Sequence, residues 1–123
     1  MKLLLIIGIG GFIGSISRYL MNTFVQNWLG TTFPIGTLFI NILGCFIIGV
    51  VFAVNSRTAM TNEAFLFFTV GLCGGFTTFS AFTIETIGLL RTGQVFNSFI
   101  YILSSVIAGI ASTFAGFSLF RNF

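Results

Sequence analysis

The stretch "GLCGGFTTFSAF", residues 71–82, decides the fold, because it places residues that weaken helices inside a long apolar run. Gly74 and Gly75 are adjacent, and the β-branched pair Thr77 and Thr78 follows shortly after. At membrane depth, non-helical backbone is tolerated only where it is buried in protein or lines an aqueous cavity. The stretch therefore predicts a membrane helix that is broken near its middle. A simple glycine-assisted kink with tight packing is the alternative.

The composition indicates an integral membrane protein. Of the 123 residues, 56% are hydrophobic and 6% are charged, and the mean hydropathy is +1.11. A water-soluble domain has about a quarter of its residues charged. The chain has two acidic residues and no histidine, which argues against an enzyme. Its five basic residues form no cluster of the kind that binds nucleic acid.

Four apolar segments reach the length of about 20 residues that a helix needs to cross a bilayer. The loops between them are too short for a further domain, so we predict one four-span membrane domain over residues 1–123. We expect the first segment to be retained, because it continues past Arg18 without the cleavage site of a secretory signal. The predicted spans are residues 3–26, 33–54, 64–89 and 96–120.

The basic residues are divided almost evenly between the two sides of the predicted bundle. With four spans, Lys2, Arg57 and Arg121 share one side. The other side has Arg91, together with Arg18 if its long side chain reaches outward. This is a weak bias under the positive-inside rule, so the chain is a candidate for insertion in both orientations. Two orientations would allow an antiparallel homodimer of dual topology.

Two short ladders of polar residues lie inside the predicted spans. Thr37 and Asn41 are four residues apart in the second span, and Tyr101 and Ser105 are four apart in the fourth. Residues at this spacing share one face of a helix. Asn41 alone is best explained by a hydrogen bond between helices, and the alternative is an amide donor that lines a pathway. The two ladders together favour a polar track.

Glu85 is the only acidic residue deep in a span, and ionisable groups at such positions are functional by default. Three states remain open from the sequence. Glu85 could pair with Arg18, accept hydrogen bonds from Asn41 or from hydroxyl groups, or be protonated. A proton-coupled carrier would also use such a carboxylate.

Phe76, Phe79, Phe82 and Glu85 recur every three residues, which puts successive pairs on one face of the helix. The edge of an aromatic ring is positive, so ring edges turned toward a narrow pore could contact an anion. The chain contains 18 phenylalanines, and chance placement is therefore the competing explanation.

Other small residues are predicted to serve packing. Gly10 and Gly14 form a G-x-x-x-G pair, which lets membrane helices approach closely. Cys45 and Cys73 lie in apolar runs without the spacing of a metal site, so we interpret them as packing residues.

Three stretches together resemble the Fluc (CrcB) fluoride channels of bacteria over essentially the whole chain: "GGFIGSISRY", "PIGTLFINILGCFIIG" and "GLCGGFTTFSAFTIE". The resemblance implies a multi-pass protein of the bacterial plasma membrane that forms an antiparallel homodimer with two fluoride pores. Its implied partners are fluoride, a second copy of the chain and the lipid bilayer.

The resemblance also implies roles for individual residues. Phe79, Phe82 and Asn41 would line the pore, Thr37, Tyr101 and Ser105 would form the polar track, Arg18 would lie near a vestibule, and Glu85 is a candidate pore-associated acid. A structural sodium ion on the dimer axis would be bound by the backbone carbonyls of Gly74 and Thr77 from each subunit.

One departure concerns the fourth span. Where the family pattern leads us to expect another hydroxyl one turn after Ser105, the chain has Gly109. The polar track is then either shorter here or completed by Ser112.

The expected function is passive export of fluoride, which relieves fluoride toxicity and needs no covalent chemistry. The alternative is a proton-coupled exporter of the small multidrug type. That family relies on a glutamate in the first span, where this chain has Arg18 and no acid. A purely structural membrane subunit would leave the break near Gly74 unexplained.

Overall fold

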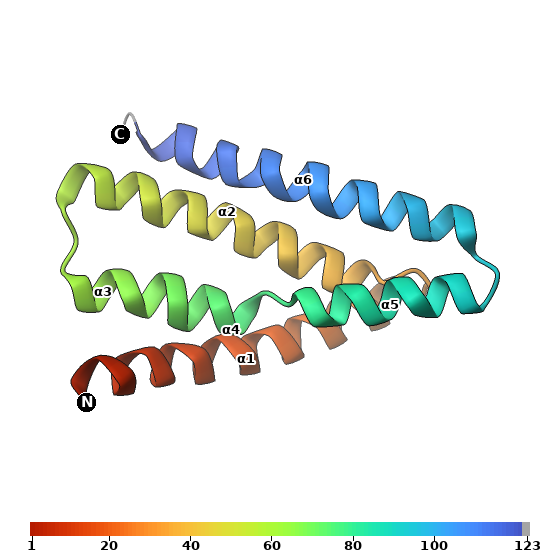
Figure 1. The fold of residues 1–123 in the computed structure, drawn as a ribbon, viewed down its shortest axis with the longest axis horizontal. Coiled ribbons are helices and arrows are strands. Elements are labelled where there is room, and N and C mark those ends of the chain that lie inside the picture. The colour runs from red at the N-terminus through yellow and green to blue at the C-terminus, as the bar shows by residue number, and fades with distance from the viewer. Residues whose placement is uncertain (122–123) are drawn as a thin grey trace.

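The structure is a computed structural model that describes residues 1–121, and these are almost entirely helical. Helix α1 covers Lys2–Leu29, α2 covers Ile35–Thr58 and α6 covers Val95–Arg121. The remaining long segment, Asn62–Arg91, is built from several shorter helices. The four segments lie side by side, with the N-terminus and the end of α6 at the same end of the bundle (Figure 1).

All four segments are long and apolar enough to cross a membrane, as the sequence predicts. Each observed boundary lies within four residues of the predicted one. Tight turns join the segments. Gly30 and Gly93 adopt positive φ angles of 57° and 78°, in the region that glycine occupies without strain.

The third segment changes its helical geometry along its length. Helix α3, Asn62–Leu66, leads into the π-helix η1, Phe67–Cys73, and then into the short helix α4, Gly74–Phe76. Helix α5, Phe79–Arg91, completes the segment. Between α4 and α5 the backbone is extended at two residues, and the interruption is visible in Figure 1.

The predicted break is confirmed, and it lies within the stretch that the sequence analysis singled out. Gly74 and Gly75 are helical, and the extended residues are Thr77 and Thr78, with ψ angles of 156° and 115°. The glycine at position 75 has another purpose, because a Cβ atom there would lie 2.5 Å from the carbonyl oxygen of Gly11. Gly75 therefore brings α4 against α1, and the threonines break the helix.

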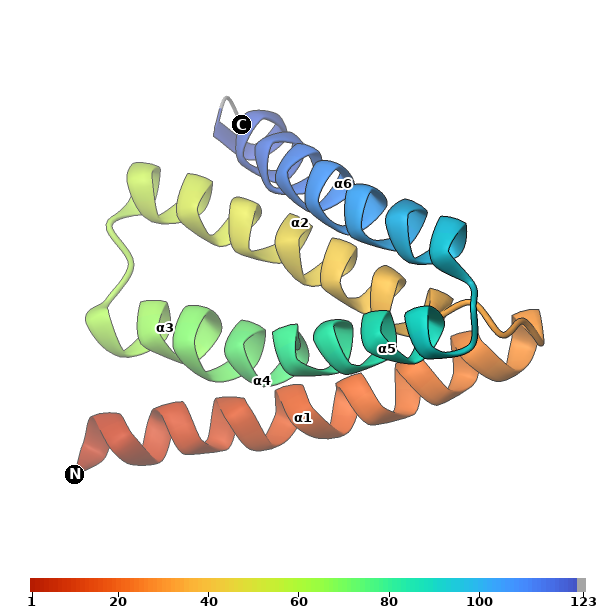
Figure 2. The ribbon, with the colours of Figure 1, turned by 45° about the vertical axis from the view of Figure 1, so that its right-hand side comes forward.

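Close packing of backbones joins α1 to the third segment, and Figure 2 shows the two running alongside each other. A Cβ atom on Gly10 would lie 2.8 Å from the carbonyl oxygen of Phe67, and one on Gly71 would lie 2.8 Å from that of Ile7. The G-x-x-x-G prediction is thus confirmed for Gly10, and Gly14 is likewise buried against the third segment. Helices in lipid have no hydrophobic driving force for association, and small residues let them pack closely enough for van der Waals contacts to hold them together.

The bundle has a small core near the end where α1 turns into α2. Leu38, Leu89 and Tyr101 are buried there, with Phe33 and Phe82 packed against them. Much of the outer surface is apolar, and large side chains such as Phe114 are mostly exposed. Such a surface suits lipid or another membrane helix, since water would not solvate it.

Candidate functional site

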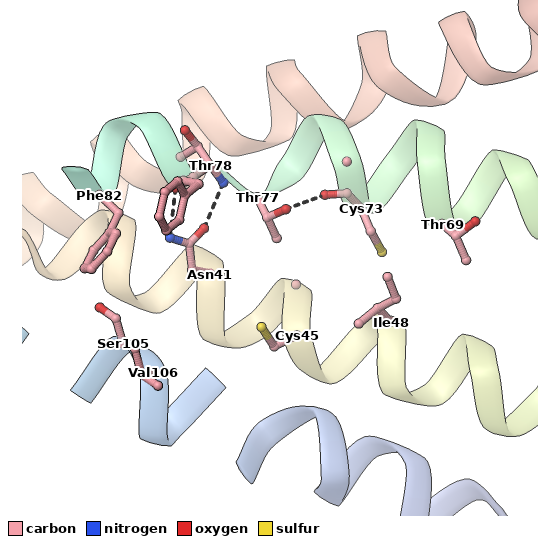
Figure 3. Close-up of a pocket in the computed structure, with 13 residues that line it drawn as sticks. Asn41, Cys45, Ile48, Thr69, Cys73, Thr77, Thr78, Phe82, Ser105 and Val106 are labelled. Atoms are coloured by element: carbon pink, nitrogen blue, oxygen red, sulfur yellow. Dashed lines mark hydrogen bonds between the residues drawn. The ribbon is translucent and has the colours of Figure 1, made fainter. Parts of the chain in front are cut away.

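The Asn41 side chain of α2 forms hydrogen bonds to the backbone at the break in the third segment. Its Oδ1 accepts a hydrogen bond from the Thr78 backbone N–H at 2.9 Å, and its Nδ2 donates to the Thr78 carbonyl at 3.1 Å (Figure 3). The predicted hydrogen bond between helices is therefore confirmed. One N–H of the amide is used in this pair, and Asn41 also lines the groove described below.

Thr78 also begins the next helix. Its Oγ1 accepts a hydrogen bond from the Ala81 backbone N–H at 3.2 Å, which is the usual role of an N-cap threonine. Its extended backbone thus lies between one helix that ends and another that begins. Side chains therefore bond to the backbone at both ends of the break.

Two backbone carbonyls lose their usual helical partners at the break. In a continuous α-helix, the Gly74 carbonyl would accept from the Thr78 N–H and the Thr77 carbonyl from the Ala81 N–H. Here these donors bond instead to Asn41 Oδ1 and to Thr78 Oγ1. Unwound carbonyls of this kind coordinate sodium ions in membrane proteins. They belong to the two residues that the family resemblance assigns to sodium.

An open groove of about 400 Å³ runs beside the break. The groove brings together six of the predicted site residues: Asn41, Gly74, Thr77, Phe79, Phe82 and Ser105. Its other lining residues are Gly44, Cys45, Ile48, Thr69, Cys73, Thr78 and Val106 (Figure 3). Both cysteines are free thiols. They line the groove in addition to packing between the helices.

The two phenylalanines face the groove differently. Their ring centroids are 5.6 Å apart and the rings are tilted by 47°. Phe79 is 76% exposed. Phe82 packs on Tyr101 with a centroid distance of 5.1 Å. Phe82 therefore links the groove to a second polar cluster.

Glu85 is the centre of that second cluster. Thr37 donates its hydroxyl to Glu85 Oε1 at 2.7 Å, and Tyr101 donates to Oε2 at 2.6 Å. Acceptance of hydrogen bonds from hydroxyl groups, one of the arrangements left open by the sequence, is observed. Within residues 1–121, neither Arg18 nor Asn41 forms a hydrogen bond or ion pair with Glu85.

Glu85 also lines a polar pocket of about 400 Å³ at the end of the bundle where α1 joins α2. The other lining residues are Asn22, Thr23, Gln26, Asn27, Thr32 and Pro34. We did not predict the four polar residues of α1 from the sequence. They form two pairs at a spacing of four residues, the same signal that identified the ladders in the second and fourth spans.

Gln26 fixes the loop beside this pocket. Its Nε2 donates to the carbonyls of Thr31 and Phe33 at 2.6 and 3.0 Å, and its Oε1 accepts from the Gly36 N–H at 3.1 Å. Arg18 lies on the same helix, one turn before Asn22 and half-buried, but it does not line the pocket. Its vestibule role stays a prediction.

The fourth span supplies fewer free hydroxyls than the family pattern implies. Ser105 lines the groove, and its Oγ is buried without a hydrogen-bond partner within residues 1–121. A Cβ atom added to Gly109 would lie 3.5 Å from the Cys45 sulfur. Ser112 donates to the Ile42 carbonyl at 2.9 Å, so it fastens α6 to α2 instead of extending the track.

Comparison with known proteins gives a consistent result along the chain. The family described as "CrcB-like protein, Camphor Resistance (CrcB)" matches residues 5–117. A protein of Phocaeicola vulgatus is 46% identical over 94% of this chain and 96% of its own length. A protein of Leptospira interrogans is 46% identical over 99% and 97%, and one of Thermus thermophilus is 42% identical over 94% and 91%. All three are named fluoride-specific ion channel FluC.

Proposed function

The chain belongs to the CrcB-like family, and from that premise we propose that it is a fluoride-selective channel through which the anion leaves the cell passively. The observation that carries this function is the near-full-length similarity to fluoride-specific channels, at 46% identity. Its four membrane-spanning helices make it a multi-pass membrane protein, and the bacterial relatives indicate the bacterial membrane. It is not an enzyme, since conduction breaks no covalent bond.

The mechanism is replacement of the water that fluoride must leave behind. Burying an unpaired anion is very costly, so donors must compensate along the path. The groove offers the second N–H of the Asn41 amide and the unpartnered hydroxyl of Ser105. Phe79 and Phe82 add positive ring edges in the same groove. Neutral donors of this kind hold an anion without trapping it.

We propose further that the working unit is an antiparallel homodimer. The groove is open on the protomer surface, and the exposed ring of Phe79 at its edge would be covered by a second copy. The near balance of basic residues between the two sides supports insertion in both orientations. A pore between two protomers would then be closed on all sides.

A structural sodium ion between the protomers is part of this proposal. The carbonyls of Gly74 and Thr77 fit such an ion, because their helical donors are diverted and both residues line the open groove. Within the described chain there is no group of three or more histidine, cysteine or acidic residues to hold a metal, so backbone oxygens are the available ligands. The ion would add a positive charge where two broken helices meet.

Fluoride efflux from liposomes that contain the purified protein tests the function. We expect rapid efflux of fluoride, much slower efflux of chloride, and rates that do not require a proton gradient. Equal rates for the two anions would contradict selectivity. Strict dependence on a proton gradient would favour the exporter alternative, in which Glu85 would carry the proton.

A further inference from the structure

Hydroxyl groups inside the helices of this protein usually turn back to their own backbone. Ser104 donates to the Ile100 carbonyl at 2.6 Å, Thr113 to that of Gly109 at 3.2 Å, and Thr86 to that of Phe82 at 2.7 Å. Such bonds satisfy the hydroxyl and leave it unavailable to a ligand. A buried hydroxyl that lacks a hydrogen-bond partner is therefore an exception in this protein.

Ser98 of α6 is such an exception. The residue is 1% exposed, and its Oγ has no hydrogen-bond partner within residues 1–121. The only other buried side-chain oxygen or nitrogen in this state among these residues is Oγ of Ser105. A buried hydroxyl without a partner lowers stability, so each case calls for an explanation in a bound water or ion.

The two unpartnered hydroxyls are aligned. Ser98, Tyr101 and Ser105 follow one another at spacings of three and four residues, so they share one face of α6. Tyr101 lies between the serines and donates to Glu85, which lines the polar pocket. Ser105 opens into the groove at the break. Ser98 lies one turn beyond Tyr101 in the opposite direction, toward the turn at residues 92–94.

We infer that Ser98 is the outermost hydroxyl of the fluoride track. It donates a hydrogen bond to the anion, or to the water that accompanies it, on the face of α6 that it shares with Tyr101 and Ser105. A serine hydroxyl has one donor that rotates freely, which suits a small anion that moves past it. The inference rests on the proposed fluoride channel and adds one contact residue to it.

The test uses four variants of the full chain in liposomes, with the initial rate of fluoride efflux measured over a range of fluoride concentrations. We expect Ser98→Ala to lower the rate about tenfold, the factor typical of one lost hydrogen bond to an ion. Ser98→Thr keeps the hydroxyl and should recover most of the rate, and Ser98→Cys, with a weak S–H donor, should fall between them. Ser104→Ala is the matched control and should behave as the unmodified chain.

Thermal unfolding in detergent separates a contact with the ion from a structural role. Because Ser98 Oγ has no protein partner, Ser98→Ala should keep the unfolding midpoint of the unmodified chain. An unchanged efflux rate in Ser98→Ala would overturn the inference, as would a loss of rate that parallels a loss of stability. If the unmodified chain itself shows no selective fluoride efflux, the proposed function fails instead.

Discussion

Asn41 is the residue on which the shape of the third segment depends. One side chain pairs with both the N–H and the carbonyl of Thr78, so it supplies the hydrogen bonds that the interrupted helix lacks. In hydrocarbon, no water is available to do the same. A residue identified from sequence as a pore donor thus also has a structural duty.

Replacing Asn41 with leucine should remove both its structural hydrogen bonds and its proposed role as a pore donor. The Thr78 N–H and carbonyl would lose their partners, at about 1–3 kcal/mol for each unsatisfied group. We expect a lower unfolding midpoint in detergent and loss of fluoride efflux. Asn97→Ala is the control, since within residues 1–121 that amide bonds only to the Gln94 side chain near the start of α6. Normal stability in Asn41→Leu would show that the break does not need this pair.

Phe82 allows a test of the aromatic ring itself. Phe82→Ile keeps an apolar side chain but removes the positive ring edge and the packing on Tyr101. Aromatic contacts contribute about 0.5–1.5 kcal/mol beyond their area, which corresponds to an efflux rate roughly two- to tenfold lower. Phe99→Ile, on an exposed position of α6, should have little effect. Equal rates in the two variants would refute the ring-edge mechanism.

At the scale of elements, adjacent glycines of α4 have different surroundings. A Cβ atom on Gly75 would meet the α1 backbone at Gly11, whereas one on Gly74 would have only the Thr69 carbonyl at 3.8 Å nearby. Gly75 therefore serves packing within the protomer. Gly74 faces the groove and is free of that constraint.

Alanine at these positions should therefore give different defects. Gly75→Ala should destabilise the protomer by about 1–3 kcal/mol, the usual cost of overpacking, as measured by thermal unfolding. Gly88→Ala is the control, because nothing lies within 4 Å of its added Cβ atom. Gly74→Ala should leave the protomer stable and weaken only the dimer, read by size-exclusion chromatography with light scattering. Equal destabilisation by Gly74→Ala and Gly75→Ala would contradict this assignment.

The helices were predicted well wherever the apolar length of a segment is enough to define them. The four spans follow from apolar length, because every backbone group in lipid must be bonded within its own helix. The break was predicted for a stretch that contains both the glycine pair and the threonine pair, because the sequence shows which residues weaken a helix but not which of them a distant side chain will bond. The side chain that bonds to Thr78 is that of Asn41, which lies in another span. The pocket residues of α1 were missed since their pairing partner, a loop folded back by Gln26, is visible only in three dimensions.

At the scale of the whole molecule, the groove that would carry the proposed pore is open on the surface of the protomer. The surface beside the groove is apolar, which suits a second copy in the membrane. The charge balance bears on how that copy would be oriented. A chain with three basic residues on one side and one or two on the other has little preference.

Changing the balance of basic residues between the two sides should therefore change fluoride efflux without altering any residue of the proposed pore. Arg91→Gln removes a charge from the side that has fewer, so more chains should insert in one orientation and fewer antiparallel dimers should form. We expect lower fluoride efflux from cells, and partial recovery when Arg91→Gln is co-expressed with Arg121→Gln, which brings the two sides closer to an even number of basic residues and so favours insertion in both orientations. Arg91→Lys keeps the charge and serves as control. An unaltered rate in Arg91→Gln would argue against orientation as a limiting factor.

The pairing of Asn41 with Thr78 has a consequence for biosynthesis. Thr78 is 37 residues later in the chain, so at about 5–20 residues per second it leaves the ribosome roughly 2–7 seconds after Asn41. The second span is then already in the bilayer when the vulnerable backbone of the third arrives. The chain thus synthesises the partner before the segment that needs it. Reversing the order of these spans would expose an unbonded peptide group to lipid during insertion.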